Sequence, residues 1–378
     1  MTDVVIAGYA RSPFHLAGKG ALARVRPDDL AAQTIRGLIE KTGVDAALIE
    51  DIVLGCAFPE GEQGLNVARM IGLLADLPLS VGGMTVNRFC GSSMSAIHIA
   101  MGQIAVGAGE AYICAGLESM SRVPMGGYNP LPNPELAAKS AGAYMGMGQT
   151  AENVAQKYQI TRTEQEAFAV KSQQKAAAAR EDGRLSDEIV AIRTKAGAVD
   201  QDGTLRPDTT AEALAGLKPA FSQDGSVTAG TSSPLTDGAS AVLVTSEDFA
   251  KQHNLPILAK IKSISVSGCD PETMGLGPIG ASKKALERAG ISANDLDIVE
   301  INEAFASQAI ACIRDLGLKE ETINLDGGAI AIGHPLGATG ARIVGKAAAL
   351  LAREGKRYAL ATQCIGGGQG IATVLERV

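Results

Sequence analysis

The chain contains an internal repeat, and this repeat limits its fold more than any other feature of the sequence. Residues 43–53 (GVDAALIEDIV) resemble residues 290–299 (GISANDLDIV), and the second copy is one residue shorter. Each copy follows a segment with the apolar spacing of an amphipathic helix, at residues 30–41 and 281–289. Self-similarity of this kind indicates a duplicated structural unit.

A second match extends the repeat. Residues 87–90 (NRFC) and 302–305 (NEAF) each follow an apolar strand, and each lead into a helix, expected at residues 92–106 and 306–316. Strands and helices therefore alternate in both copies. This pattern predicts two copies of one α/β unit, with mostly parallel strands covered by helices on both faces.

The two copies are separated by more residues than one unit needs. The excess lies at about residues 120–224, where a Gly- and Pro-rich stretch precedes a charged helix expected at residues 163–182. We interpret it as an inserted loop domain. The predicted N-terminal half is residues 1–255, including this insertion, and the C-terminal half is residues 256–378.

Composition excludes several classes of protein. A net charge of −7 is unlike the basic footprint of a nucleic-acid binder. The six cysteines form no C-x-x-C pair and the four histidines are scattered, which argues against a metal site. No apolar run is long enough for a membrane span. The first expected strand, residues 4–7, leaves no room for a presequence, and the C-terminus is not a peroxisomal signal. We expect a cytoplasmic protein.

Cys90 is expected at a turn from a strand to a helix. The helix N-terminus favours a thiolate over a thiol. The small residues Gly91, Ser92 and Ser93 are expected to leave space for a substrate beside the sulfur. The alternative is a buried structural cysteine at a tight turn, and position alone does not separate the two.

Two glycine-rich segments near the C-terminus also carry reactive groups. His334 lies between glycines in residues 327–340 (GGAIAIGHPLGATG), a setting that favours ligand contact over simple packing. Cys364 lies in residues 363–370 (QCIGGGQG), whose amides suit an oxyanion hole. A dinucleotide loop is rejected there, because the spacing is not G-x-G-x-x-G and a strand follows.

Asn302 completes the candidate site. In the repeat it corresponds to Asn87, and Phe305 takes the place of Cys90. One copy would then carry the nucleophile and the other a polar support. The alternative is that Asn302 caps its own helix. Two cysteines, one histidine and one asparagine at equivalent strand ends favour acyl transfer.

These motifs resemble the signatures of the thiolase family: V-N-x-x-C-G-S, N-E-A-F, G-G-A-I-A-x-G-H-P-x-G-x-(S/T)-G and C-x-G-G-G-x-G. All four occur in order, and the resemblance covers essentially the whole chain. It implies a duplicated, layered α/β fold in which two β-sheets sandwich helices in five layers, αβαβα, with an inserted loop domain.

The resemblance also implies a role for each matched residue. Cys90 would be the acylated nucleophile, and His334 would deprotonate it and then help to hold the thioester oxygen of the substrate. Asn302 would fix a water that shares this oxyanion. Cys364 would be the acid and base. The amides of Cys90 and Gly366 would form a second oxyanion hole.

Coenzyme A is expected as a substrate, with no tightly bound cofactor. Residues 228–233 (TAGTSS) resemble the turn of the family that contacts pantetheine, with Ser233 as the contact residue. Phe221 and Met147 are expected to border the pocket. The resemblance further implies a homodimer or homotetramer, with a hydratase/dehydrogenase subunit as a possible partner.

Two subclasses of the thiolase family are consistent with these motifs. Biosynthetic enzymes carry a histidine where this chain has Gly146, which favours degradative cleavage of 3-ketoacyl-CoA with CoA, as in fatty-acid β-oxidation, by a ping-pong mechanism. The alternative is Claisen condensation of two acetyl-CoA molecules. A decarboxylating ketoacyl synthase shares the fold but would lack Cys364. A non-catalytic CoA-binding subunit is less consistent with the complete set of reactive residues.

Overall fold

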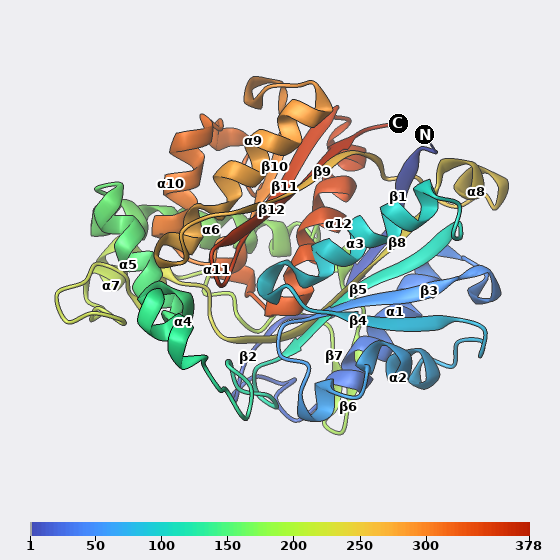
Figure 1. The fold of residues 1–378 in the computed structure, drawn as a ribbon, viewed down its shortest axis with the longest axis horizontal. Coiled ribbons are helices and arrows are strands. Elements are labelled where there is room, and N and C mark those ends of the chain that lie inside the picture. Colours follow the sequence, from blue (N-terminus) through green and yellow to red (C-terminus); the bar gives the residue numbers. More distant parts are fainter. Residues whose placement is uncertain (1) are drawn as a thin grey trace.

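The computed structural model describes residues 2–378 and shows an α/β molecule built around one large mixed sheet (Figure 1). Its strands run in the order β10-β11-β12-β9-β1-β8-β5-β3-β4, with β2 paired to β8, and β6 and β7 form a separate small sheet. The strands are β1 (Val4–Arg11), β2 (His15–Leu16), β3 (Asp51–Cys56), β4 (Gly82–Val86), β5 (Ala111–Ser119), β6 (Ile192–Thr194), β7 (Gly197–Val199), β8 (Thr236–Ser246), β9 (Ala259–Gly268), β10 (Ile298–Ile301), β11 (Tyr358–Ile365) and β12 (Gln369–Glu376).

The helices match the repeat in the sequence. Those expected at residues 30–41 and 281–289 are α1 and α9, and both end at a glycine in the left-handed conformation, Gly43 and Gly290. The helices are α1 (Pro27–Thr42), α2 (Val67–Leu74), α3 (Ser92–Ala105), α4 (Pro134–Lys139), α5 (Met147–Lys157), α6 (Arg162–Glu181), α7 (Ala211–Ala215), α8 (Glu247–Gln252), α9 (Gly277–Ala289), α10 (Ala306–Leu316), α11 (Ala329–Ile332) and α12 (Leu336–Glu354). Among residues 2–378, none of these helices combines the length and apolar character that crossing a membrane requires.

The duplication is visible in the order of the strands. In the N-terminal half β3 is parallel to β5, β5 is antiparallel to β8, and β8 is antiparallel to β1. In the C-terminal half β10, β11, β12 and β9 repeat this pattern. The halves meet where β1 pairs with β9 through Val5–Lys260 and Ile6–Ala259, so the two sheets are hydrogen-bonded into one. The predicted duplicated α/β fold is confirmed.

The expectation of mostly parallel strands was wrong. Only the β3–β4, β3–β5 and β10–β11 pairs are parallel in the large sheet. Antiparallel pairing arises because β11 and β12 are joined by a tight turn rather than by a crossover helix. Similarly, the long segment between β5 and β8 brings the chain back antiparallel to β5.

Buried side chains divide the molecule into layers. One apolar cluster joins α1 and α2 to the N-terminal strands, and another joins α9 and α10 to the C-terminal strands. Between them, α3 and α12 pack against strands of both halves, and Figure 1 shows these two helices at the centre of the molecule. The five-layer arrangement predicted from the resemblance is therefore present, with α3 and α12 as the middle layer.

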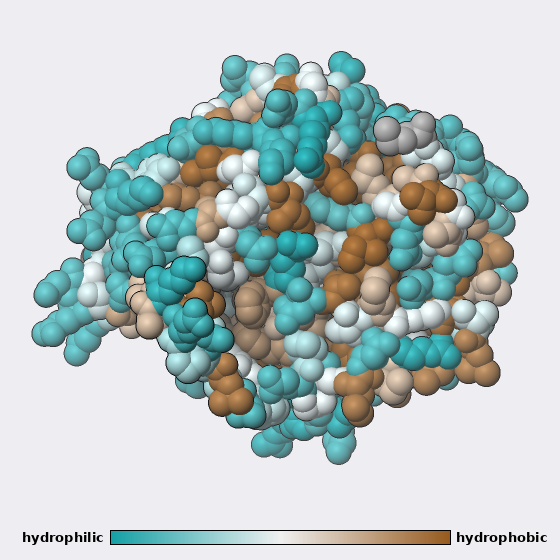
Figure 2. Space-filling model, in the orientation of Figure 1, coloured by the Kyte–Doolittle hydropathy of each residue, from teal (hydrophilic) through white to brown (hydrophobic). Residues whose placement is uncertain are grey.

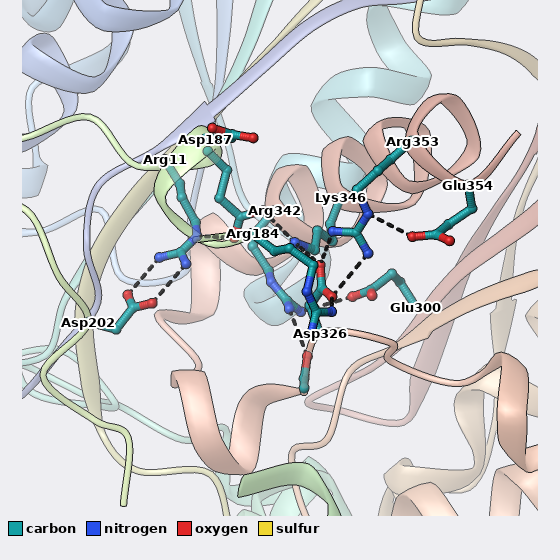
Figure 3. Close-up of polar contacts among 12 residues, drawn as sticks. Arg11, Arg184, Asp187, Asp202, Glu300, Asp326, Arg342, Lys346, Arg353 and Glu354 are labelled. Carbon is teal, nitrogen blue, oxygen red and sulfur yellow. Dashed lines mark hydrogen bonds and ion pairs between the residues drawn. The ribbon is translucent and has the colours of Figure 1, made fainter. Parts of the chain in front are cut away.

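Buried ion pairs tie the segment between β5 and β8 to both halves (Figure 3). Arg11 on β1 pairs with Asp202 and Glu188, both at 2.7 Å. Lys346 on α12 pairs with Glu188 at 2.8 Å and with Asp326 at 2.7 Å. Because a buried charge without a partner is costly, this network restricts where the segment can lie.

Candidate active site

Cys90 lies in a strained turn between β4 and α3. The preceding residue, Phe89, has a φ of 43°, a region that residues other than glycine rarely adopt. Asn87 supports this turn, because its Oδ1 accepts the Phe89 N–H at 2.8 Å and its Nδ2 donates to the Ala57 carbonyl at 3.0 Å. Strain of this kind is typical of functional sites.

The thiol of Cys90 is buried and faces two amide donors. Burial raises its pKa to about 11, while the N–H groups of Gly366 and of Cys90 itself act in the opposite direction. Cys90 is therefore a neutral thiol at neutral pH in the free protein. The amides of Gly366 and Cys90 thus lie at the same sulfur, and the oxyanion hole assigned to them stays a prediction.

The small residues after Cys90 serve packing. Gly91, Ser92 and Ser93 are all buried, so the expectation that they leave space for a substrate was wrong. A Cβ atom at Gly91 would lie 2.5 Å from Ile365, and the Ser93 hydroxyl accepts the Ala341 N–H at 2.8 Å. Their small size lets α3 approach β11 and α12 closely.

His334 lies in the turn between α11 and α12, and its hydrogen bonds define its tautomer. The Thr339 hydroxyl donates to the Pro335 carbonyl at 3.0 Å and lies 2.6 Å from Nδ1 of His334, so Nδ1 carries the proton. Nε2 is then an acceptor, and Nδ2 of Asn302 donates to it at 3.3 Å. Burial, followed by the charge of Arg342, lowers the pKa of His334 to about 3, so the ring is neutral at pH 7.

Asn302 presents an unused polar atom to the site. It follows β10 and is fully buried, and its Oδ1 has no hydrogen-bond partner among residues 2–378. The N-cap residue of α10 is Phe305, and no side chain caps this helix, so the alternative of Asn302 as a helix cap was wrong. Its counterpart Asn87 has both amide groups occupied. A buried amide with a spare acceptor is suited to a ligand or bridging water.

Cys364 lies near the end of β11. It is fully buried and packs in an apolar cluster with Phe305 and Met274. Burial raises the pKa of Cys364 well above its usual value, and the charge that Cys90 would carry raises it further. The two thiols are therefore close enough to influence each other's ionisation.

The glycine run after Cys364 forms the turn into β12. Gly368 has a φ of 84°, and a Cβ atom there would lie 2.4 Å from the Cys269 carbonyl oxygen, so only glycine fits. At Gly366 a Cβ atom would lie 3.5 Å from the sulfur of Met147. Met147, the first residue of α5, therefore borders this turn, and its place at a CoA pocket stays a prediction.

The remaining predicted pocket residues also lie beside this cluster. The ring of Phe221 packs edge-on against Phe305, with 5.8 Å between centroids, and is half-exposed. The backbone and hydroxyl groups of Ser233 donate to the Ala304 carbonyl at 3.0 and 3.1 Å. Because the Ser233 hydroxyl donates its hydrogen bond to the protein, only its oxygen lone pairs are left to accept a hydrogen bond from a ligand.

Glu118, at the end of β5, is a site residue that the sequence analysis missed. Its buried carboxylate accepts N–H groups from Ala57 at 2.8 Å, Phe58 at 3.3 Å, Gln63 at 2.9 Å and Gly337 at 2.9 Å. Gly337 belongs to the His334 turn, and Ala57 is the residue to which Asn87 donates. Glu118 therefore connects the turn that carries the histidine to the turn that carries the cysteine.

Comparison with known proteins agrees with this geometry. The family model described as "Thiolase, N-terminal domain" matches residues 4–248, and "Thiolase, C-terminal domain" matches residues 255–377. The chain is 46% identical over 389 residues to a 3-ketoacyl-CoA thiolase of Bacillus subtilis (strain 168), and 48% identical over 388 residues to one of Pseudoalteromonas translucida (strain TAC 125). Each alignment covers 100% of both chains.

The fold is similar to that of solved structures. Human mitochondrial 3-ketoacyl-CoA thiolase in complex with CoA superposes with a TM-score of 0.92 at 37% identity, covering 100% of this chain and 98% of the human one. A second structure of the human enzyme gives a TM-score of 0.91 at 37% identity, covering 100% and 99%. The chain belongs to the thiolase family.

Proposed function

We propose that this protein cleaves 3-ketoacyl-CoA with coenzyme A, giving acetyl-CoA and a shortened acyl-CoA. The observation that carries the proposal is the pair of neighbouring thiols, Cys90 and Cys364, with the Gly366 amide at the Cys90 sulfur. The neutral imidazole of His334, which contacts Asn302, supports it. The names of the relatives, which share 46–48% identity over their full length, support the same substrate class.

In the first half-reaction, the Cys90 sulfur attacks the 3-keto carbon and its proton passes to Nε2 of His334. The amides of Cys90 and Gly366 stabilise the oxyanion of the tetrahedral intermediate. The Cα–Cβ bond then breaks and leaves the enolate of acetyl-CoA. The protonated Nε2 of His334 and a water fixed by Asn302 donate to the thioester oxygen of this enolate, and Cys364 protonates its carbon.

In the second half-reaction, Cys364, now a thiolate, takes the proton of an incoming CoA thiol. The CoA sulfur attacks the acyl thioester on Cys90, and the same two amides stabilise the second tetrahedral intermediate. The departing Cys90 sulfur recovers its proton from His334, so both residues return to the neutral state. This order requires ping-pong kinetics.

The test follows the loss of 3-ketoacyl-CoA with CoA present, over short to long acyl chains. Mass spectrometry after mixing with acetyl-CoA should show an adduct on Cys90 that is absent in Cys90→Ala and retained in Cys114→Ala, a buried cysteine on β5. Cys364→Ala should acylate slowly and exchange α-protons poorly. No turnover at any chain length, or an adduct on another residue, would contradict the proposal.

The degradative direction is favoured by the space at the start of α5. Gly146, at the position where biosynthetic enzymes carry histidine, has nothing within 4 Å of where a Cβ would lie. The missing side chain leaves room beside Met147 for a longer acyl chain. Turnover restricted to acetoacetyl-CoA would support the biosynthetic alternative instead.

We also propose a homodimer that forms through the edge strand β4. This strand has a neighbour on one side only, and the residues around it leave apolar side chains in water, with Leu65 89% and Leu79 80% exposed. Figure 2 shows further hydrophobic side chains over α2 on the same side of the molecule. Leu79→Lys should yield monomers by light scattering. An unchanged mass would place the interface elsewhere, for example in a tetramer contact of the inserted segment.

Domain limits and cellular location stay proposals based on the sequence. Limited proteolysis between α8 and β9 should give fragments 1–255 and 256–378 on a denaturing gel, and cleavage within 120–224 should leave the two halves associated. The described cysteines are all free thiols, which suits a reducing compartment such as the cytoplasm. A hydratase/dehydrogenase partner rests on the family resemblance alone, and co-purification with such a subunit would test it.

A further inference from the structure

A large cleft lies away from the acyl-transfer residues. It has a volume of about 1210 Å³ and opens between the loop of residues 18–26, one face of α1 and the β6–β7 hairpin. Gln33 of α1 forms part of its floor, where it accepts the Arg193 N–H at 2.8 Å and so holds the hairpin against the helix. None of the proposed catalytic or CoA-contacting residues lines this cleft.

The lining of the cleft is strongly cationic. It contains seven basic side chains and three carboxylates, an excess of four positive charges in a chain whose net charge is −7. Two of its arginines, Arg26 and Arg122, pair with Glu62, and Arg26 also pairs with Asp28. The excess of positive charge is therefore local to this cleft, and its sign is opposite to that of the net charge of the molecule.

Four of these cations have no partner. The side chains of Lys19, Arg24, Arg193 and Lys195 are exposed, and within residues 2–378 none of them has an ion pair or a side-chain hydrogen bond. Lys19 and Arg24 come from the loop, and Arg193 and Lys195 from the hairpin, so they face the cleft from opposite walls. Charges of one sign in a concave surface concentrate an oppositely charged ligand.

We propose that this cleft binds a soluble polyphosphate ligand of the nucleotide class, separately from the acyl-transfer site. A phosphoanhydride places several negative charges within a few ångströms, which allows both walls to be engaged at once. The planar guanidinium groups of Arg24 and Arg193 match the paired oxygens of phosphate. The volume also accommodates a nucleotide rather than a single small anion.

The experiment is calorimetric titration of the whole protein with pyrophosphate and with ADP, at low and at physiological salt. The variant Arg193→Gln/Lys195→Gln changes only exposed side chains and should bind pyrophosphate about tenfold more weakly. The matched control Lys139→Gln/Lys356→Gln removes two exposed cations outside the cleft and should leave the affinity unchanged. Added salt should weaken binding to the unaltered protein more than to the hairpin variant.

Three results would overturn the proposal: no binding of either phosphate at low salt, equal weakening in both double variants, or tighter binding of a deca-glutamate peptide than of both phosphates. The last result would assign the cleft to an acidic protein segment. Thiolysis by both variants serves as the folding check, because neither changes a residue of the acyl-transfer site.

Discussion

Glu118→Gln separates the charge of this buried side chain from its shape. In the native protein Oε2 accepts the N–H groups of Ala57 and Gly337, and Oε1 accepts those of Phe58 and Gln63. Whichever way a glutamine amide is turned, its NH₂ group faces two donors that lose their acceptor. At about 1–3 kcal/mol for each unpaired buried group, the loss is about 2–6 kcal/mol. This is a large part of the roughly 5–15 kcal/mol by which proteins are stable.

The substitution should also alter the chemistry in two opposite ways. The Gly337 amide anchors the turn that carries His334, and a shift of about 1 Å at a catalytic group costs about 100-fold in rate. The charge of Glu118 raises the pKa of Cys90, after the larger effect of burial, so its removal should lower that pKa. We therefore expect slower thiolysis together with faster alkylation of Cys90 at a given pH.

The measurements are urea unfolding, steady-state thiolysis and the pH profile of Cys90 alkylation by iodoacetamide. Glu118→Asp is the matched comparison, because it keeps the charge but shortens the reach; it should lose stability without moving the alkylation profile to lower pH. If Glu118→Gln unfolds within about 0.5 kcal/mol of the unaltered protein and keeps its alkylation profile, the role assigned to Glu118 is refuted.

Asn302→Ala should lower kcat for thiolysis about 10²–10³-fold, which is the usual effect of losing one oxyanion donor. Acylation of Cys90, detected by mass spectrometry, should persist. An unchanged kcat would remove Asn302 from the mechanism. Alkylation of Cys90 in the free protein should still rise above pH 10, because its pKa is raised to about 11. In the urea-unfolded chain the profile should have its midpoint near about pH 8.5–9, and coincident profiles would contradict the burial argument. Burial acts to raise the pKa of Glu188, but the charges of Lys346 and Arg11 outweigh this effect and lower the pKa to about 2. The Glu188 carboxylate therefore stabilises the folded protein above about pH 4.3, and this stabilisation is lost as the pH falls toward 2. Lys346→Met should weaken that dependence and destabilise the protein at pH 7 by about 3–5 kcal/mol in urea unfolding, and an unaltered acid transition would show that the pair does not control it.

The duplicated fold and the helices of the repeat were predictable because they follow from local pattern. Apolar spacing placed α10 at its observed limits, residues 306–316, and the repeat paired it with α3. Strand direction was not predictable in the same way, because it depends on how the chain returns to the sheet. The hairpin at residues 366–368 and the long excursion before β8 both produce antiparallel pairs that no periodicity records.

The residues of the candidate site show the same difference between local signals and long-range contacts. Cys90, His334, Asn302 and Cys364 each carry a local signal, a reactive group at a strand end or among glycines. The structure brings Cys90 near Cys364 and Asn302 into contact with His334. Glu118 also had a signal, a single carboxylate in the apolar stretch of residues 111–119, but its meaning depends on partners far away in sequence. Its contacts with Ala57 and Gly337 span 61 and 219 residues, and only the packed layers bring them together.

Burial has the same consequence for both members of the proposed nucleophile and base pair. It raises the pKa of Cys90 to about 11 and lowers that of His334 to about 3, so each shift favours the neutral form. A thiolate–imidazolium pair is therefore disfavoured in the free protein, and the thiol is protected from alkylation and oxidation, which need the thiolate. Transfer of the Cys90 proton to Nε2 of His334 must then accompany attack of the sulfur on the substrate. During this attack the negative charge develops on the ketone oxygen, which accepts hydrogen bonds from the Cys90 and Gly366 amides. On this argument the protein makes its nucleophile only when a ketone carbon is in place, and the same burial that makes Cys90 unreactive at rest strengthens every hydrogen bond that stabilises the oxyanion.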